Sequence, residues 1–264
     1  MLYYNQYVRA ESLDEAYTLY QKKNNFILAG MLWQKMRNKT MGTAIDLCGL
    51  GLDKIEETEE AFRIGAYVSL RDLETDEALN TYTGGAFRES VRHIVGVQFR
   101  NVATVGGSIW GRFGFSDVMT IFRALGAKVE LHHAGMMDLD DFVKFPRKTR
   151  DILVAVIVPK NVKGVVYVSQ RNQSTDFPVL TCAVAKRADG YAAAIGATPH
   201  LAEVVVVPER ELSELSDEQM DAFAGQVCDE IRFGSNMRAG AAYRKTVCRV
   251  LVRRAMQALK GELD

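Results

Sequence analysis

Two adjacent glycines flanked by hydroxyl side chains form the part of the sequence that is best suited to bind a ligand. The run is Thr104-Val105-Gly106-Gly107-Ser108. A glycine pair lets the backbone approach a ligand closely and adopt positive φ, which exposes successive N–H groups, and Thr104 and Ser108 add hydroxyl donors. Because phosphate oxygens need several converging donors, the run predicts a phosphate or pyrophosphate loop. The alternative is a tight hairpin in which the glycines only satisfy turn geometry.

A helix start follows the glycine run at Ser116-Asp117. The apolar spacing from Val118 to Leu125 predicts an amphipathic helix that ends at Gly126. The positive end of such a helix favours an anion, but the carboxylate of Asp117 would repel a phosphate. Asp117 is therefore better suited to accept a hydrogen bond from a ribose or ribityl hydroxyl.

Cysteine and histidine spacing argues against metal chemistry. No two of the four cysteines are close enough for a Cys-x-x-Cys zinc, iron–sulfur or redox pair, and we expect four buried thiols. His132 and His133 point to opposite faces if they end a strand, which disfavours a shared metal. No Ser/His/Asp or paired-carboxylate constellation is evident, so we predict neither a catalytic residue nor a metal site on this chain. The cysteines are Cys48, Cys182, Cys228 and Cys248.

The elements that hold these residues begin with a small α/β unit. Ser12 and Glu15 match a capping box, and apolar residues at helical spacing follow them. Residues 26–30 (Phe-Ile-Leu-Ala-Gly) read as a buried strand that runs into a glycine turn, and residues 43–47 read as its neighbour. Strand, helix and strand in this order are typical of an α/β unit.

The rest of the chain changes from a mixed to an antiparallel pattern. Residues 54–159 predict strands and short helices, ending in a buried strand at 152–158. After this strand, strand-like runs are separated by connections too short for crossovers, which favours antiparallel pairing. Two helices close the chain, one starting at Ser216 in a capping box and one over 236–259. The strand-like runs are 165–168, 179–185, 191–197 and 204–207.

Composition and charge exclude several classes of protein. The 264 residues carry 33 basic and 33 acidic side chains, so the formal net charge is zero, and 48% of the residues are hydrophobic. This composition excludes disordered and disulfide-scaffold proteins, and zero net charge argues against a dedicated nucleic-acid binder. The apolar runs are far shorter than a membrane span and the first residues lack a signal-peptide pattern. We therefore expect no membrane contact and a cytoplasmic location.

The glycine run is part of a longer motif that extends from Gln98 to Ile109 (QFRNVATVGGSI) and is followed by Ser116-Asp117. This motif resembles the FAD-binding (medium) subunit of the molybdenum hydroxylase family, which includes xanthine dehydrogenase and carbon monoxide dehydrogenase. Ile64-Gly65-Ala66 and Ala242-Tyr243-Arg244 also match pieces of the family in the same order. The similarity therefore spans nearly the whole chain.

The resemblance implies an α+β fold with three consecutive parts. Residues 1–53 and 54–159 would form the two lobes of a PCMH-type FAD-binding domain, with FAD between them. Residues 160–264 would form a separate C-terminal domain of an antiparallel sheet with helices.

The same resemblance implies a set of FAD-binding residues. Both glycine loops would hold the pyrophosphate, and Asp117 would bind a hydroxyl of the cofactor. The first loop departs from the family, which has Ala-Gly-Gly-Thr or Ala-Gly-Gly-Ser where this chain has Ala29-Gly30-Met31-Leu32. Since a neutral hydrogen bond contributes about 1 kcal/mol, we expect weakened FAD binding and not its abolition. The implied cofactor-binding residues are Ala29, Gly30, Met31, Thr104, Gly106, Gly107, Ser108 and Asp117.

Several nearby side chains have two interpretations each. Trp33 either packs on a ring of the cofactor or, as we expect, lies in the core beneath the first loop. Arg100 and Arg112 are candidates for charge near the cofactor, with surface salt bridges as the expected role. Trp110 either stacks near the flavin or fills space between the lobes. Gln170-Arg171 resembles a family motif, and a structural turn is the simpler interpretation.

The last predicted helix is strongly basic, with no acidic residue between Met237 and Lys260. A membrane or nucleic-acid surface is one interpretation of such a run. We favour solvation and docking onto an acidic partner subunit, because the overall charge is zero.

The resemblance finally implies an electron-transfer flavoprotein subunit. Substrate would be oxidised at the molybdopterin subunit of a complex, and electrons would pass through an iron–sulfur subunit to FAD on this chain and on to NAD+ or another acceptor. Two alternatives remain open. One is a scaffold or assembly subunit with weak or lost FAD binding, motivated by Met31-Leu32. The other is a stand-alone FAD oxidase, which would need its own base and substrate pocket.

Overall fold

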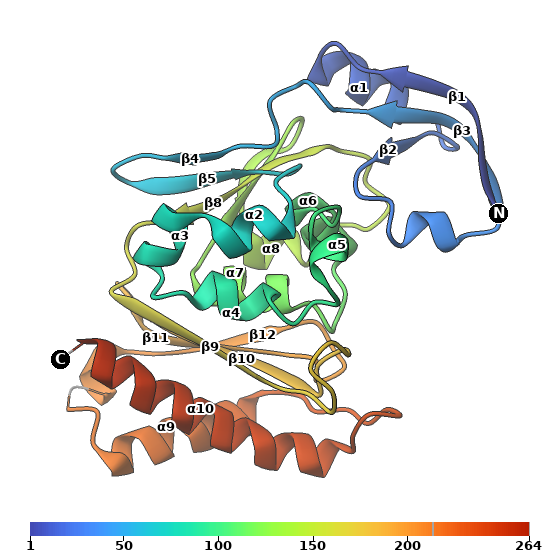
Figure 1. Cartoon of the computed structure of the whole chain (residues 1–264). Helices are drawn as coiled ribbons and strands as arrows, with labels where there is room; N and C mark the ends of the chain where they lie inside the picture. The colour runs from blue at the N-terminus through green and yellow to red at the C-terminus, as the bar shows by residue number, and fades with distance from the viewer. Residues whose placement is uncertain (213, 264) are drawn as a thin grey trace.

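The computed structural model describes residues 1–212 and 214–263, and they form three β-sheets that follow one another along the chain (Figure 1). The combination of helices with antiparallel sheets confirms the predicted α+β class. Each sheet lies inside one of the three predicted parts, whose boundaries stay a prediction. Ser213 and Asp264, which fall in the predicted C-terminal part, lie outside the described residues.

The N-terminal sheet is small and parallel, in the order β1-β3-β2. Parallel neighbours need a crossover connection, and a helix provides one here. That helix begins as predicted, because the side chain of Ser12 accepts a hydrogen bond from the N–H of Glu15. The elements are β1 (Leu2–Arg9), α1 (Leu13–Tyr20), β2 (Phe26–Leu28), η1 (Gln34–Met36) and β3 (Lys39–Asp46).

The middle sheet has five antiparallel strands in the order β4-β5-β8-β6-β7, and several short helices connect β5 to β6. Ser69 caps the first of these helices in a capping box with Asp72. The strands are β4 (Ile55–Glu57), β5 (Ala61–Gly65), β6 (Lys128–Leu131), β7 (Gly135–Asp138) and β8 (Leu153–Pro159). The helices are α2 (Leu70–Thr75), α3 (Glu77–Tyr82), α4 (Ala86–Val91), α5 (Val97–Arg100), α6 (Val105–Gly111), α7 (Asp117–Ala124) and α8 (Leu139–Phe142).

The C-terminal sheet is antiparallel in the order β12-β11-β10-β9, as the short connections predicted. The capping box at Ser216 and Gln219 is also confirmed. The elements are β9 (Gly164–Gln170), β10 (Leu180–Arg187), β11 (Gly190–Gly196), β12 (Glu203–Val207), η2 (Glu209–Glu211), α9 (Asp217–Glu230) and α10 (Ala241–Leu263).

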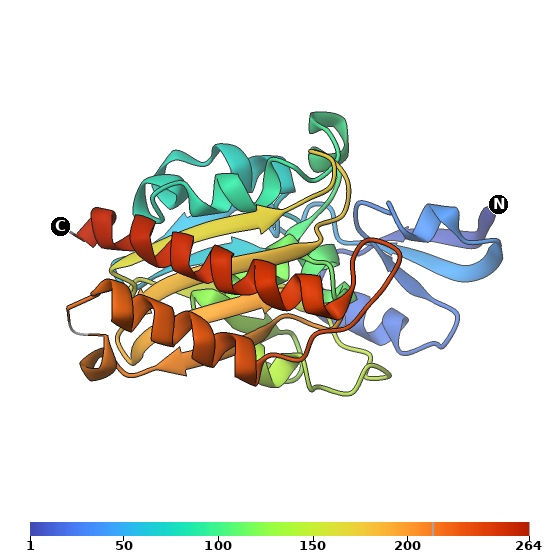
Figure 2. The same cartoon turned by 90° about the horizontal axis from the view of Figure 1, so that it is seen from below.

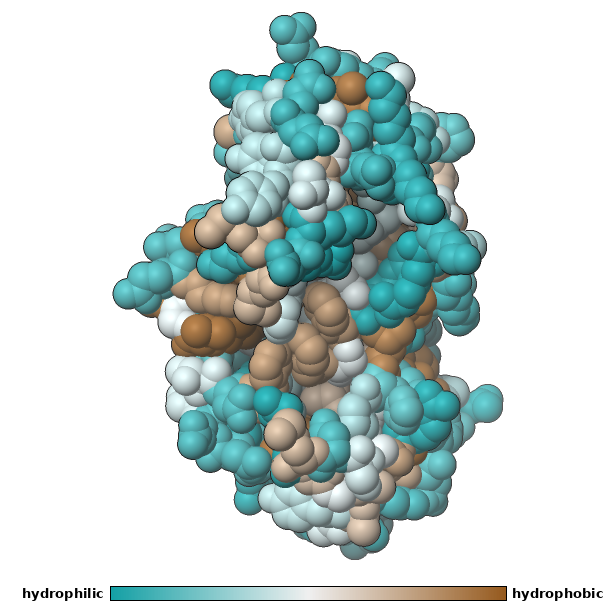
Figure 3. Space-filling view, turned by 90° about the vertical axis from the view of Figure 1, so that its right-hand side faces the viewer, coloured by the Kyte–Doolittle hydropathy of each residue, from teal (hydrophilic) through white to brown (hydrophobic). Residues whose placement is uncertain are grey.

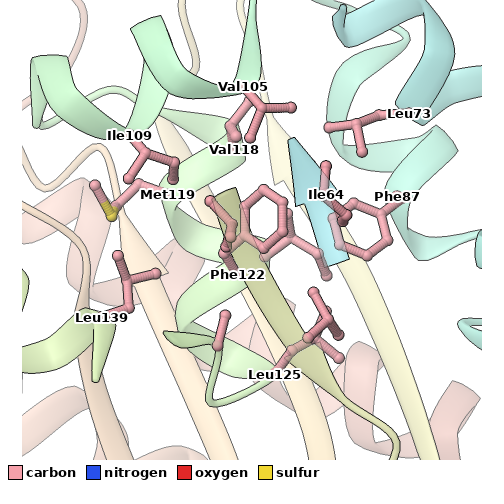
Figure 4. Close-up of a cluster of buried hydrophobic side chains, with 14 of the residues drawn as sticks. Ile64, Leu73, Phe87, Val105, Ile109, Val118, Met119, Phe122, Leu125 and Leu139 are labelled. Atoms are coloured by element: carbon pink, nitrogen blue, oxygen red, sulfur yellow. The ribbon is translucent and has the colours of Figure 1, made fainter. Parts of the chain in front are cut away.

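The middle and C-terminal sheets share a helical layer. Helices α4 and α7 pack between them, and α9 and α10 cover the opposite face of the C-terminal sheet (Figures 1 and 2). The shared layer contains a core of fully buried side chains around Phe87 and Phe122, whose rings meet edge to face at 5.0 Å (Figure 4). This core fixes the N-terminal end of α7, where Asp117 lies.

Two expectations, one about the start of the last helix and one about the cysteines, are wrong. The last helix begins at Ala241 and not at 236, because Asn236 pairs with Ala239 in a turn that precedes it. Cys48 is exposed, whereas the other three cysteines are buried.

Within the described residues, no helix combines the length and apolar character needed to cross a membrane.

Part of the positive charge predicted for the last helix is engaged by groups of the same chain. Arg244 is fully buried and donates to the carbonyl oxygens of Val179, Gly234 and Ala239. Lys245 pairs with Asp229 of α9 at 2.9 Å. The helix therefore presents less free charge to a partner than its sequence predicts.

One face of the molecule carries apolar side chains across its middle, between hydrophilic surfaces above and below (Figure 3). This band lies at the height of α5 in Figure 1. The valines Val95, Val97 and Val102, which flank or begin α5, are exposed.

Candidate functional site

A cavity of about 590 Å³ brings together the two glycine-containing segments that the sequence predicts to act jointly. The N-terminal lobe contributes residues 29–34, α6 and the residues just before it contribute a second wall, and residues 171 and 175–178 of the C-terminal part contribute a third. Cavities of this size are typical of small-molecule and cofactor sites. All eight predicted cofactor-binding residues lie in its wall: Ala29, Gly30, Met31, Thr104, Gly106, Gly107, Ser108 and Asp117.

The glycine pair lies in the first turn of α6, so its local conformation is neither the predicted loop nor the alternative hairpin. Thr104 is the N-cap, and its hydroxyl accepts a hydrogen bond from the N–H of Gly107 at 3.1 Å. The N–H of Gly106 donates to the carbonyl of Ala66 at 2.8 Å, and the N–H of Ser108 donates to that of Thr104. These backbone donors are therefore already bonded within the protein.

Close packing explains why glycines are needed in this turn. A Cβ atom added at Gly106 would lie 2.7 Å from the carbonyl oxygen of Ala66, which no side chain tolerates. Gly107 faces the cavity, where the absence of a side chain leaves room for a ligand beside the positive end of α6. The two glycines are needed because they leave room for neighbouring atoms and not because they adopt positive φ.

The first loop supplies the free donors that α6 lacks. Among the described residues, the N–H groups of residues 30–33 donate no hydrogen bond, and all four residues line the cavity. Gly30 lies so close to the backbone of Val102 that any side chain would overlap the Val102 carbonyl oxygen. Successive unpaired N–H groups of this kind form a cradle for an anion.

Met31 holds the conformation that a glycine would take at its position. Its φ is 58°, in the left-handed region that favours glycine. The left-handed conformation costs a side chain about 1–2 kcal/mol. The departure from the family at Met31 therefore changes the side chain of the loop. The backbone keeps a path that is compatible with N–H donors that point into the cavity.

Asp117 is buried in the cavity wall and belongs to a polar cluster. Its carboxylate accepts a hydrogen bond from the Tyr167 hydroxyl at 2.5 Å and pairs with the guanidinium of Arg171. Burial raises the pKa of Asp117 to about 6, against the lowering effect of Arg171. Arg171 therefore does more than form the predicted turn. Tyr167 was not predicted as a site residue, since no sequence motif near it indicates such a role.

An aromatic wall lines the cavity beside this cluster, and the expectation that Trp33 lies in the core is wrong. Trp33 is 42% exposed, and its ring lies 5.4 Å from that of Phe113 and 5.8 Å from that of Phe115. Phe177, from the C-terminal part, packs on Phe115 at 4.4 Å. The wall offers flat apolar surfaces to a planar ligand.

Two arginines that were expected at the surface are buried. Arg100 forms an ion pair with Glu74 at 2.8 Å and donates to the carbonyl of Ile94. Arg112 is 4% exposed, has a φ of 46°, and stacks over the ring of Phe142 at 4.3 Å. Arg100 is therefore structural, whereas Arg112 lies beside the cavity with no ion pair to any described carboxylate.

Comparison with known proteins decides the family. The model of the family described as "FAD binding domain in molybdopterin dehydrogenase" matches residues 3–161. The chain belongs to this family. FAD is accordingly its cofactor, and the protein is the FAD-binding component of an oxidoreductase of the molybdenum hydroxylase type.

Relatives of this FAD-binding protein cover most of its length. The glyceraldehyde dehydrogenase medium chain of Sulfolobus acidocaldarius is 25% identical over 95% of this chain and 96% of its own. The nicotine 6-hydroxylase medium subunit of Paenarthrobacter nicotinovorans is 25% identical over 84% of this chain and 83% of its own. A chain of the reconstituted CO dehydrogenase from Oligotropha carboxidovorans has the same fold, with a TM-score of 0.84 over 98% of both chains at 21% identity.

The residues present fit FAD. The cofactor needs an anion cradle for its pyrophosphate, a polar partner for its sugar hydroxyls and flat apolar walls for its rings. The free N–H groups of residues 30–33, the carboxylate of Asp117 and the ring of Trp33 provide these three elements around one cavity. Trp110 also lines this cavity, with its ring 5.6 Å from that of Phe142.

Proposed function

We propose that this chain is the electron-transfer flavoprotein subunit of a multi-subunit molybdenum hydroxylase. Electrons arrive from an iron–sulfur subunit, which receives them from a molybdopterin subunit, and leave for NAD+ or another acceptor. Bound FAD supplies the two-electron redox chemistry that such a relay needs. The cavity that combines an anion cradle with an aromatic wall is the observation that carries the proposal.

The chain's own residues bind and orient the cofactor in this scheme. The N–H groups of residues 30–33 hold the pyrophosphate, beside the glycine turn of α6. Asp117, fixed by Arg171 and Tyr167, accepts a hydrogen bond from a sugar hydroxyl. The aromatic wall around Trp33 packs against a ring and excludes water. No proton transfer by a side chain is required.

Relatives with the same extent support a subunit role. The two curated relatives named above are a medium chain and a medium subunit, which is the naming of components of larger enzymes. The proposal places the iron–sulfur clusters on a partner chain, as the cysteine spacing predicts. It also places the complex in the cytoplasm, because all four cysteines are unpaired thiols, which is typical of a reducing compartment.

The absorption spectrum of the purified chain tests the cofactor part of the proposal. We expect flavin bands at roughly 370 and 450 nm after reconstitution with FAD, since the bands come with the cofactor. Gly107→Val should abolish them, because its side chain fills the cavity and its Cβ lies 3.1 Å from the Thr104 hydroxyl. Gly225→Val is the matched control, because an added Cβ in α9 meets no atom within 4 Å.

A colourless chain that FAD does not reconstitute would overturn the flavoprotein role and favour the scaffold alternative, which Met31-Leu32 motivates. Co-purification with cluster-bearing and molybdopterin-bearing chains tests the partners. Bleaching of the 450 nm band by NADH, read in the reverse direction, tests NAD+ as acceptor. Substrate oxidation by the isolated chain would instead support a stand-alone oxidase.

A further inference from the structure

Four aromatic side chains form one wall of the cavity, and they come from three separate parts of the chain. Trp33 follows the first loop, Phe113 and Phe115 lie between α6 and α7, and Phe177 belongs to the C-terminal part. The rings of Phe113 and Phe115 are nearly parallel at 5.2 Å, and Phe177 meets Phe115 edge to face at 4.4 Å. The wall is therefore one connected apolar surface.

The indole of Trp33 packs on this wall with part of its surface and leaves the rest free. Its ring lies 5.4 Å from that of Phe113, 5.8 Å from that of Phe115 and 6.2 Å from that of Phe177. Trp33 is nevertheless 42% exposed. Tryptophan is highly buried on average, because its large apolar surface is costly to leave in water. The free surface of the indole is therefore the part of the wall that a planar ligand can cover.

The anion cradle of residues 30–33 lies between this wall and a second apolar end of the cavity. Gly30, at the start of the cradle, packs so closely on Ala103 that an added Cβ would lie 3.3 Å from the Cα atom of Ala103. The carbonyl of Ala103 accepts a hydrogen bond from the N–H of Leu70 at 2.8 Å, and Leu70 and Ile94 also line the cavity. Trp33, at the other end of the cradle, belongs to the aromatic wall. A pyrophosphate in the cradle therefore has an apolar surface on each side.

The aromatic end suits the isoalloxazine of FAD better than the adenine. Isoalloxazine is tricyclic and adenine bicyclic, so the isoalloxazine needs the wider flat surface, which the four aromatic rings provide. It is also the ring that exchanges electrons, and it must lie where a partner can approach it. Trp33 is partly exposed, whereas Leu70 and Ala103 at the other end are 2% and 7% exposed.

Asp117 lies at the same end of the cavity as the aromatic wall. Its carboxylate pairs with Arg171, which donates to the carbonyl of Asp176 at 2.6 Å, and Asp176 directly precedes Phe177. In FAD, a polyol chain joins the isoalloxazine to the pyrophosphate. Asp117 is therefore placed to accept a hydrogen bond from a hydroxyl of that chain when the isoalloxazine lies at Trp33.

We propose that Trp33 is the residue on which the isoalloxazine of FAD stacks, and that the adenine does not contact it. The inference rests on the proposed flavoprotein function and adds which half of the cofactor this residue recognises. Phe113, Phe115 and Phe177 support the indole from other parts of the chain, which restricts its rotation and presents its free surface to the cavity.

Calorimetric titration of the flavin-free full chain with FMN and with ADP tests this assignment, because each probe carries only one of the two ring systems of FAD. We expect Trp33→Leu to weaken FMN binding by roughly fivefold or more, since a stacking surface is lost, and to leave ADP binding unchanged. Trp33→Phe keeps an aromatic ring and should restore part of the FMN affinity. Tyr243→Leu is the matched control, since it removes a half-exposed aromatic ring outside the cavity wall.

The two probes separate recognition of the isoalloxazine from a merely structural role of Trp33. Equal weakening of FMN and ADP binding in Trp33→Leu would show that Trp33 only shapes the cradle, and weakening of ADP binding alone would place the adenine there. Either result overturns the proposal, as does an FMN affinity of Trp33→Leu equal to that of Tyr243→Leu.

Failure of this inference can be told apart from failure of the proposed function. A wild-type chain that binds FAD and ADP but not FMN overturns the assignment of Trp33 and leaves the flavoprotein role in place. A wild-type chain that binds none of the three contradicts both.

Discussion

Replacing Arg171 by methionine removes the guanidinium that faces Asp117 and keeps a side chain of similar length. In the wild type, the Arg171 side chain is 7% exposed and the Asp117 side chain 6%. Arg171 also donates to the carbonyl of Asp176 at 2.6 Å and to the hydroxyl of Ser169 at 3.3 Å. The substitution therefore leaves Asp117 with the Tyr167 hydroxyl as its remaining side-chain partner.

The expected loss is large and depends on pH. Removing one partner of a buried ion pair costs about 3–5 kcal/mol, which for a chain of this size lowers the melting temperature by roughly 6–20 °C. The pKa of Asp117 is already raised from 3.8 to about 6 by burial. Because Arg171 lowers this pKa, its removal raises the pKa further, and each further unit costs about 1.4 kcal/mol at high pH.

The direction of the pH dependence of stability follows from the linkage between folding and protonation of Asp117. A carboxyl group whose pKa is raised on folding favours the folded state below about pH 4, and this contribution is lost as the pH rises through about 6. In the wild type the loss amounts to about 3 kcal/mol. In Arg171→Met the loss extends to higher pH, so the variant should be far less stable than the wild type at pH 8 and closer to it at pH 5.

Thermal or urea unfolding at pH 5 and pH 8 provides the assay. Arg171→Lys is the control that keeps a positive charge, and it should show a pH dependence close to that of the wild type. Asp117→Asn should remove the loss of stability between pH 4 and 6. An equal destabilisation of Arg171→Met at both pH values would refute the reasoning, because the hydrogen bonds to Ser169 and Asp176 would then account for the whole effect.

Two further predictions concern the close approach of the first loop and the C-terminal helix pair. Gly30→Ala should weaken FAD binding by at least tenfold in a fluorescence titration, since its Cβ would overlap the Val102 carbonyl. The control Gly225→Ala should leave FAD binding unchanged. An unaltered FAD affinity of Gly30→Ala would contradict the observed packing. Arg244→Met should destabilise the chain by about 3 kcal/mol or more in urea unfolding, because several buried carbonyls lose their donor. A loss below about 1 kcal/mol would show that water replaces those bonds.

Local features of the fold could be predicted from the sequence because they depend on residues a few positions apart. Ser12 and Ser216 cap helices where expected, since an N-cap reaches only two or three residues along the chain. The antiparallel C-terminal sheet was likewise predictable, because its short connections allow no crossover.

Features that depend on distant contacts could not be predicted. The glycine pair reads as a loop, but the first turn of α6 forms because the N–H of Gly106 bonds to the carbonyl of Ala66, on another segment. Trp33 reads as a core residue, but it packs against Phe113 and Phe177 at the cavity and stays partly exposed. Arg112 was expected at the surface, but it is buried.

The sequence by itself determined the family, the cofactor and the two segments that meet at the cavity, because the motif from Gln98 to Ile109 is long and specific. Only the tertiary structure decided which groups are available to a ligand. Residues 30–33 keep free N–H donors while those of α6 are bonded internally, and Asp117 meets Arg171 across 54 positions of sequence. Hydrogen bonds and ion pairs between distant segments depend on how the chain packs, and the order of residues does not encode them locally.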